Sequence, residues 1–113
     1  MIKILAFDGD DTLWHNEAAY LEAASKFESL MATKYGLTGI DGEIYKTEKE
    51  NIRIFGYGVK SYTISMIETA VRLTEGRVEG RHVAEIARYG KAILDQELQL
   101  ISGAENIVKK LAV

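Results

Sequence analysis

The chain has 113 residues, of which 47% are hydrophobic and 27% are charged, so its length and composition fit one small globular domain rather than a disordered chain. A formal net charge of −3 gives no basic surface for nucleic acid, and the absence of cysteine excludes disulfides and thiolate chemistry. No apolar segment is long enough for a membrane span or a signal peptide, so we expect a cytoplasmic protein that binds neither membrane nor nucleic acid.

The first predicted element is a short buried strand over residues 4–7, an unbroken apolar run. Three carboxylates, Asp8, Asp10 and Asp11, follow it within four residues. The carboxyl end of such a strand is where open α/β sheets place their active sites. Clustered carboxylates repel one another unless a cation lies between them, and oxygen ligands suit Mg²⁺. The sequence therefore predicts a magnesium site on a loop after this strand.

Helices are predicted over most of the remaining chain. The first covers residues 17–35, with Asn16 as N-cap and Gly36 as the stop, and the second covers residues 42–55 after an Asp41 cap. Ser61 is predicted to cap a third helix that ends near Gly76. A fourth is expected over residues 80–98, a break over residues 100–103, and a short fifth helix over residues 104–111. The chain contains no proline, which favours long helices.

Apolar periodicity predicts which side of each helix faces a core. The charged residues from Glu43 to Arg53 are expected on a solvated face, and His82 on the surface. The residues expected to face inward are Tyr20, Ala23, Ala24, Phe27, Leu30 and Met31 on the first helix, Ile64, Ile67, Ala70, Val71 and Leu73 on the third, and Val83, Ile86, Ala87, Ile93, Leu94 and Leu98 on the fourth.

One strand among about five helices leaves a structural problem. A lone buried strand has no hydrogen-bonding partner for its backbone, and parallel strands come in sets. We therefore expect this sequence to be the N-terminal part of a longer α/β protein. The alternatives are a strand that pairs across a dimer, or an N-terminal arm. An unfinished core also predicts self-association through its open strand edge or apolar patches.

The segment Asp8-Gly9-Asp10-Asp11-Thr12-Leu13, after an apolar strand, resembles the first motif of the haloacid dehalogenase (HAD) superfamily, Asp-x-Asp-x-Thr-Leu. The resemblance implies an α/β, Rossmann-like core, of which this chain holds the first strand and one helix in residues 1–14 and 101–113. It also implies an α-helical cap in residues 15–100, so that the chain itself is mostly α. Ser102 stands where the family usually has a proline before the glycine, a mild departure.

The same resemblance implies a Mg²⁺-dependent phosphatase that acts on a small phosphorylated metabolite. Asp8 would be the nucleophile that forms an aspartyl-phosphate, and Asp10 the general acid and base. Gly9 would let the backbone approach the phosphate, and Thr12 would hold the loop. Asp8, with Asp10, would bind the metal. An aspartate at the second motif position favours phosphoryl transfer over dehalogenation, and Asp11 has no assigned role.

Two alternatives stay open. Asp and Gly also make good turns, so the second hypothesis is a small helical interaction or regulatory domain whose acidic loop has no chemistry. The family's later Ser or Thr, Lys or Arg, and acidic motifs are missing, so we expect this chain to be inactive alone. The Gly56-Tyr57-Gly58 segment is either a turn between helices or a loop that faces a substrate.

Overall fold

The structure is a computed structural model that describes the backbone of residues 10–112 and the side chains of residues 17–99. This part of the chain forms four helices and contains no strand: α1 (Asp10–Tyr35), α2 (Glu43–Phe55), α3 (Val59–Leu73) and α4 (Gly80–Ala112). The prediction that the chain is mostly α is confirmed. The predicted strand over residues 4–7, with Asp8 and Gly9, lies outside the described residues, so the α/β core is not seen. None of the described helices combines the length and apolar character needed to cross a bilayer.

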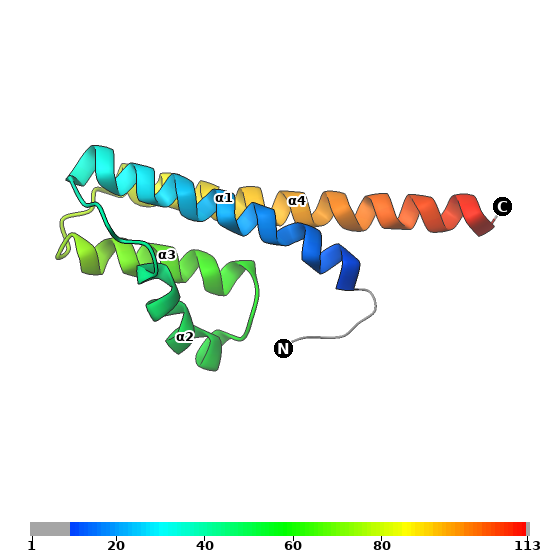
Figure 1. The fold of residues 1–113 in the computed structure, drawn as a ribbon, viewed down its shortest axis with the longest axis horizontal. Coiled ribbons are helices and arrows are strands. Elements are labelled where there is room, and N and C mark those ends of the chain that lie inside the picture. The colour runs from blue at the N-terminus through cyan, green and yellow to red at the C-terminus, as the bar shows by residue number, and fades with distance from the viewer. Residues whose placement is uncertain (1–9, 113) are drawn as a thin grey trace.

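The two long helices, α1 and α4, lie side by side and run in opposite directions (Figure 1). Large apolar side chains fill the seam between them, because α1 repeats them at helical spacing. Phe27 and Met31 are fully buried, and so is Ile86 of α4. At the end of this seam, the Tyr35 hydroxyl lies 2.5 Å from Nδ1 of His82 and accepts a hydrogen bond from the Glu79 amide. Because His82 is only 6% exposed, its predicted surface position is wrong.

The shorter helices, α2 and α3, form a helical hairpin beside the long pair, with α2 inclined to α3 (Figure 1). Several buried or part-buried hydrogen bonds join them. Ser65 Oγ donates to Glu48 Oε1 at 2.5 Å, and Asn51 Nδ2 donates to Ser65 Oγ at 3.0 Å. The hydroxyl oxygens of Thr69 and Thr47 lie 2.9 Å apart. Buried polar groups persist in a protein when such partners replace water.

Helix α3 packs against both α2 and α4. Gly90 of α4 allows the two helices α3 and α4 to approach closely where they cross. A Cβ atom added at Gly90 would lie 2.0 Å from Thr63 Oγ1 and 2.9 Å from Thr63 Cβ. No side chain other than hydrogen fits at that distance. Met66 and Ala70 of α3 are fully buried on the side that joins the core of α1 and α4.

The start of α1 and all the predicted N-caps differ from expectation. Helix α1 begins at Asp10, so Asn16 lies inside it, because residues 10–35 contain neither glycine nor proline to stop the helix. Gly42 and Gly58 precede α2 and α3 without any side-chain cap, in place of Asp41 and Ser61. The predicted stop at Gly36 is confirmed by its positive φ of 68° directly after Tyr35.

The C-terminal helix continues through its predicted break. Helix α4 is one helix of 33 residues, and it includes residues 100–103 and the predicted fifth helix. A glycine such as Gly103 costs a helix only about 1 kcal/mol relative to alanine, so without a proline it does not end the helix.

The predicted inward faces are correct for α1 and only partly correct for α3 and α4. Val71, Leu94 and Leu98 are 43%, 42% and 55% exposed. Ser61, Ser65 and Thr69 are instead buried on α3 because α2 supplies hydrogen-bond partners for that side. Glu48 also departs from the expected solvated face, since its carboxylate accepts from Ser61 and Ser65.

Candidate functional site

The predicted catalytic segment falls at the beginning of α1. Asp10 and Thr12 lie in the first turn of this helix rather than on the predicted loop. Their side chains, and all of Asp8 and Gly9, lie outside what the structure describes, so the assigned site roles stay predictions. The first backbone N–H groups of a helix have no partner within the helix, and its dipole favours negative charge at that end. A phosphoryl group beside Asp10 would meet these donors.

The Mg²⁺ expectation rests on the aspartate segment alone. In the described part of the chain, no group of three or more His, Asp or Glu side chains is placed to hold a metal ion. The donor chemistry of Asp8 and Asp10 suits Mg²⁺, which prefers one or two carboxylates together with water and phosphate oxygens. The magnesium site therefore remains a prediction from these two residues.

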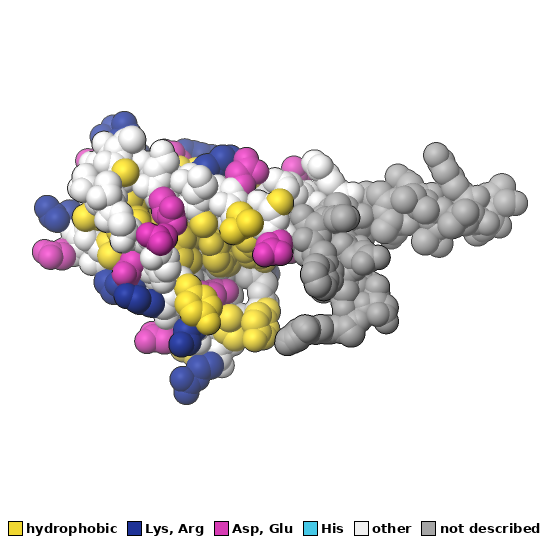
Figure 2. Space-filling model, in the orientation of Figure 1, with side chains coloured by type: hydrophobic (Ala, Val, Ile, Leu, Met, Phe, Trp, Pro, Cys, Tyr) yellow, Lys and Arg dark blue, Asp and Glu magenta, His cyan; other side chains and the backbone are white. Residues whose placement is uncertain are grey.

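The connection between α2 and α3 exposes several large apolar side chains. Helix α2 ends at Phe55 and α3 begins at Val59, which confirms the predicted break at Gly56-Tyr57-Gly58. Tyr57 is 87% exposed, and Phe55 and Ile54 are 55% and 72% exposed. Figure 2 shows hydrophobic side chains on this face, over α2 and along the junction with α1. Side chains in such a position are free to contact a ligand or another part of a protein.

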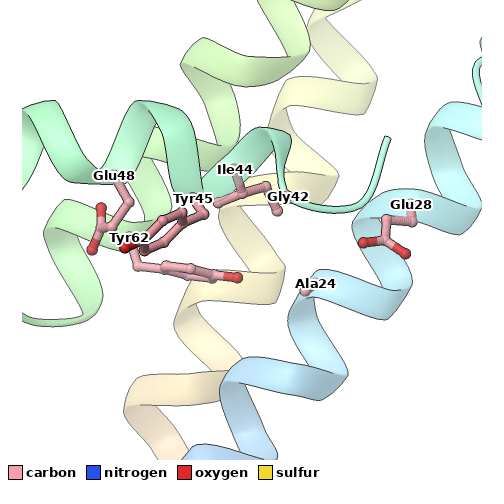
Figure 3. Close-up of a pocket in the computed structure, with 7 residues that line it drawn as sticks. All are labelled: Ala24, Glu28, Gly42, Ile44, Tyr45, Glu48 and Tyr62. Carbon is pink, nitrogen blue, oxygen red and sulfur yellow. The ribbon is translucent and has the colours of Figure 1, made fainter. Parts of the chain in front are cut away.

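A pocket of about 240 Å³ opens between α1 and the α2–α3 hairpin (Figure 3). Glu28 lies on the α1 side of it, and Tyr62 of α3 and Glu48 of α2 lie across from Glu28. The remaining lining residues are Ala24, Gly42, Ile44 and Tyr45. Sequence analysis assigned no site role to any of these residues, because they come from separate helices whose packing the sequence pattern does not reveal.

Tyr62, which lines this pocket, and Tyr20, which packs against Tyr62, have raised pKa values. The rings of Tyr20 and Tyr62 meet edge to face, with their centroids 5.0 Å apart. Burial and the carboxylates of Glu48 and Glu28 raise the pKa of Tyr62 to about 12. Burial, followed by the charges of Glu97 and Glu48, likewise raises the pKa of Tyr20. Both phenols therefore stay protonated at neutral pH and offer hydroxyl groups rather than negative charge.

Comparison with solved structures finds similarity to a hydrolase. A crystal structure of a haloacid dehalogenase-like family hydrolase from Xanthomonas campestris matches with a TM-score of 0.63 and 39% sequence identity. The match covers 71% of this chain and 33% of that chain, so this chain spans about a third of the hydrolase's length. No protein-family model and no curated protein matches. This chain therefore resembles one part of a haloacid dehalogenase-like family hydrolase in both sequence and fold.

Proposed function

We propose that this chain carries the nucleophile segment and helical cap of a Mg²⁺-dependent HAD-like phosphatase that acts on a small phosphorylated metabolite. The observation that carries the proposal is the 39% identity with a HAD-like hydrolase. The segment Asp8-Gly9-Asp10-Asp11-Thr12-Leu13 supports it independently, because its first and second aspartates match the phosphatase form of the family motif.

The chemistry follows from two carboxylates. An oxygen of Asp8 attacks phosphorus and forms a new O–P bond, while the bond from phosphorus to the leaving oxygen breaks. Asp10 gives its proton to that leaving oxygen. In the second step Asp10 takes a proton from water, which attacks phosphorus and releases phosphate and free Asp8. Gly9 and Thr12 would shape the backbone around the phosphoryl group.

Mg²⁺ fits this arrangement through the carboxylate of Asp8 and through Asp10. When bound, it would offset the repulsion between an anionic nucleophile and an anionic substrate.

The four helices would act as the cap that chooses the substrate. Tyr57 supports this role, because an exposed aromatic ring between two conformationally free glycines is available to contact a ligand. Gly56 and Gly58 have φ values of 79° and 134°, which side chains with a Cβ atom rarely adopt.

The experiment is an assay of the product of the complete gene with para-nitrophenyl phosphate and Mg²⁺, beside an Asp8→Asn variant. We expect this substitution to lower turnover by at least about 1,000-fold, because the nucleophile is lost. Asp10→Asn should lower it about 100- to 10,000-fold through loss of acid–base catalysis.

Asp11→Asn is the matched control, because it removes a neighbouring carboxylate that has no proposed role. Its turnover should stay close to that of the parent protein. Turnover that is unaffected by Asp8→Asn would overturn the assignment of the nucleophile. If Asp11→Asn removed activity and Asp8→Asn did not, the register of the motif would be wrong.

A further inference from the structure

Helix α4 carries two apolar stripes, and only one of them is covered by the rest of the described chain. The first contains Ile86 and Ile93, which are fully buried in the core that α4 shares with α1 and α3. The second contains Leu94 and Leu98, which are 42% and 55% exposed. Two side chains four residues apart lie on the same face of a helix, so these leucines form one exposed apolar ridge.

An apolar groove of about 360 Å³ lies beside this ridge, between α3 and α4. Val59 and Ile64 line it from α3, and Ala87 lines it from α4. Its charged lining residues, Lys60 and Lys91, are both exposed, so their ammonium groups can stay in water when the groove is filled. One face of the molecule therefore carries both a ridge and a groove. A symmetric dimer requires this combination, because each copy must offer both parts to the other.

The spacing along α4 favours another helix as the occupant of this face. Ala87, Lys91, Leu94 and Leu98 follow one another at intervals of 4, 3 and 4 residues. Alternating intervals of three and four residues are typical of a helix that packs along a second helix. The buried stripe with Ile86 and Ile93 uses the same spacing of seven residues to pack inside the molecule. The exposed stripe is therefore built like one that already has a partner.

The charges on the exposed stripe favour a second α4 in antiparallel orientation. Within residues 17–99, neither Lys91 nor Asp95 belongs to an ion pair, and the Asp95 carboxylate accepts a hydrogen bond from Gln99 at 3.2 Å. Each lies two residues from Ile93 along the chain, on opposite sides of it. A two-fold axis level with Ile93 would therefore place Lys91 of each copy opposite Asp95 of the other.

The same alignment also fits the apolar side chains. Leu94 lies one residue from the level of the axis, so the two Leu94 side chains would meet there. Leu98 lies five residues from that level, which places it beside Ala87 of the other copy, at the groove. A single antiparallel alignment therefore pairs the charges and brings each ridge to the groove of the other copy.

We propose that this face of α4 binds a second copy of the chain. The two α4 helices run antiparallel, Leu98 of each copy lies in the groove of the other, and Lys91 pairs with Asp95 across the interface. Because the contact involves only part of two helices, we expect a weak dimer with a dissociation constant on the order of 10–100 μM. The proposal does not rest on the phosphatase chemistry, and its test measures no turnover, so the two can fail separately.

The test is sedimentation velocity of the chain from about 5 μM to about 500 μM, where a dimer of this strength forms progressively. Leu98→Glu should weaken self-association at least about tenfold, because it brings a carboxylate to an apolar groove. Leu21→Glu is the matched control, since Leu21 is 64% exposed on α1 and does not line the groove. It should dimerise like the parent chain, and circular dichroism shows whether each variant keeps its helices.

An exchange of charges tests the antiparallel alignment. Lys91→Glu and Asp95→Lys each place like charges opposite one another, so each alone should weaken self-association about three- to tenfold at low salt. In a mixture of these two variants, every pair across the interface has opposite charges again. The mixture should therefore dimerise like the parent chain, a result that ion pairs within one helix cannot produce.

The same measurements on the product of the complete gene distinguish a second copy from the rest of the protein. A dimer that Leu98→Glu weakens supports the proposal, whereas a monomer at every concentration would mean that another part of the protein covers this face and would overturn it. The proposal is also overturned if Leu98→Glu dimerises as tightly as the parent chain, or if the mixture of charge variants stays monomeric. Loss of self-association in Tyr57→Ser but not in Leu98→Glu would place the interface at the α2–α3 connection instead.

Discussion

Two of the helix seams, the one between α1 and α4 and the one between α2 and α3, are packed by opposite means. Between α1 and α4, Phe27, Met31 and Ile86 are fully buried and form a continuous apolar layer. Between α2 and α3, Ser65 and Thr69 are equally buried, and hydrogen bonds to α2 compensate their loss of water. The apolar seam gains free energy from burial itself, while the polar seam gains little net energy and loses much when one partner is missing.

The two seams should also differ in which substitutions they tolerate and in how strictly they fix the helix register. An apolar seam accepts other hydrophobic side chains of similar volume. In the polar seam, Asn51 donates both to Ser65 at 3.0 Å and to Glu68 at 2.8 Å, so a shift of one turn between the helices would break several bonds together. The hydrogen bonds therefore fix the register of α2 against α3, which positions Glu48 and Tyr62 beside the pocket.

The largest expected effect lies in the apolar seam. Phe27→Ala should lower the free energy of unfolding by about 3–5 kcal/mol, because it removes a fully buried ring and leaves a cavity. Urea unfolding followed by circular dichroism measures this change. Leu21→Ala, on the same helix at a side chain that is 64% exposed, should change stability by less than about 0.5 kcal/mol. Similar losses for both variants would mean that α1 does not bury this face.

A smaller effect is expected in the polar seam, and it should depend on the partner. Thr69→Val keeps the shape of a fully buried side chain and removes the hydroxyl that contacts Thr47, which should cost about 1–3 kcal/mol. The double variant Thr47→Val with Thr69→Val removes both hydroxyls. It should cost less than the sum of the two single variants, as measured by a double-mutant cycle in urea. Additive losses would show that the two hydroxyls do not interact.

The same contrast explains what could be predicted from the sequence. The buried face of α1 was predictable because Phe27, Leu30 and Met31 are large and recur at helical spacing. The buried face of α3 was not, since Ser65 and Thr69 become suitable for burial only when α2 supplies partners. Leu94 and Leu98 show a further limit: periodicity indicates that residues share a face, but it does not show that another element covers that face.

The candidate sites divide in a similar way. Asp8 and Asp10 could be proposed as site residues from the sequence because both lie in one short motif. Glu28, Glu48 and Tyr62 could not be grouped, because they lie on three helices and only tertiary packing brings them to one pocket. The helical start at Asp10 was also missed, since the acidic residues were interpreted as a loop although they are favourable in the first turn of a helix.

The smallest expected effect lies at the exposed end of the seam between α2 and α3. There the stability loss caused by a substitution should depend on pH, whereas in the seam between α1 and α4 it should not. Hydrogen bonds from Arg72 at 2.9 Å and Lys46 at 3.0 Å lower the pKa of Glu43 below its ordinary value of 4.5. A pKa that is lower in the folded state stabilises the fold above the unfolded-state pKa, and this contribution is lost as the pH falls through the lowered value. Glu43→Gln should therefore be slightly less stable than the parent chain at pH 7, and the difference should disappear in acid.

Thermal unfolding between pH 2 and pH 7 measures this difference in stability. The loss of stability caused by Phe27→Ala should stay constant over that range because no charge is involved. A pH-independent difference for Glu43→Gln would show that Arg72 and Lys46 do not act on this carboxylate.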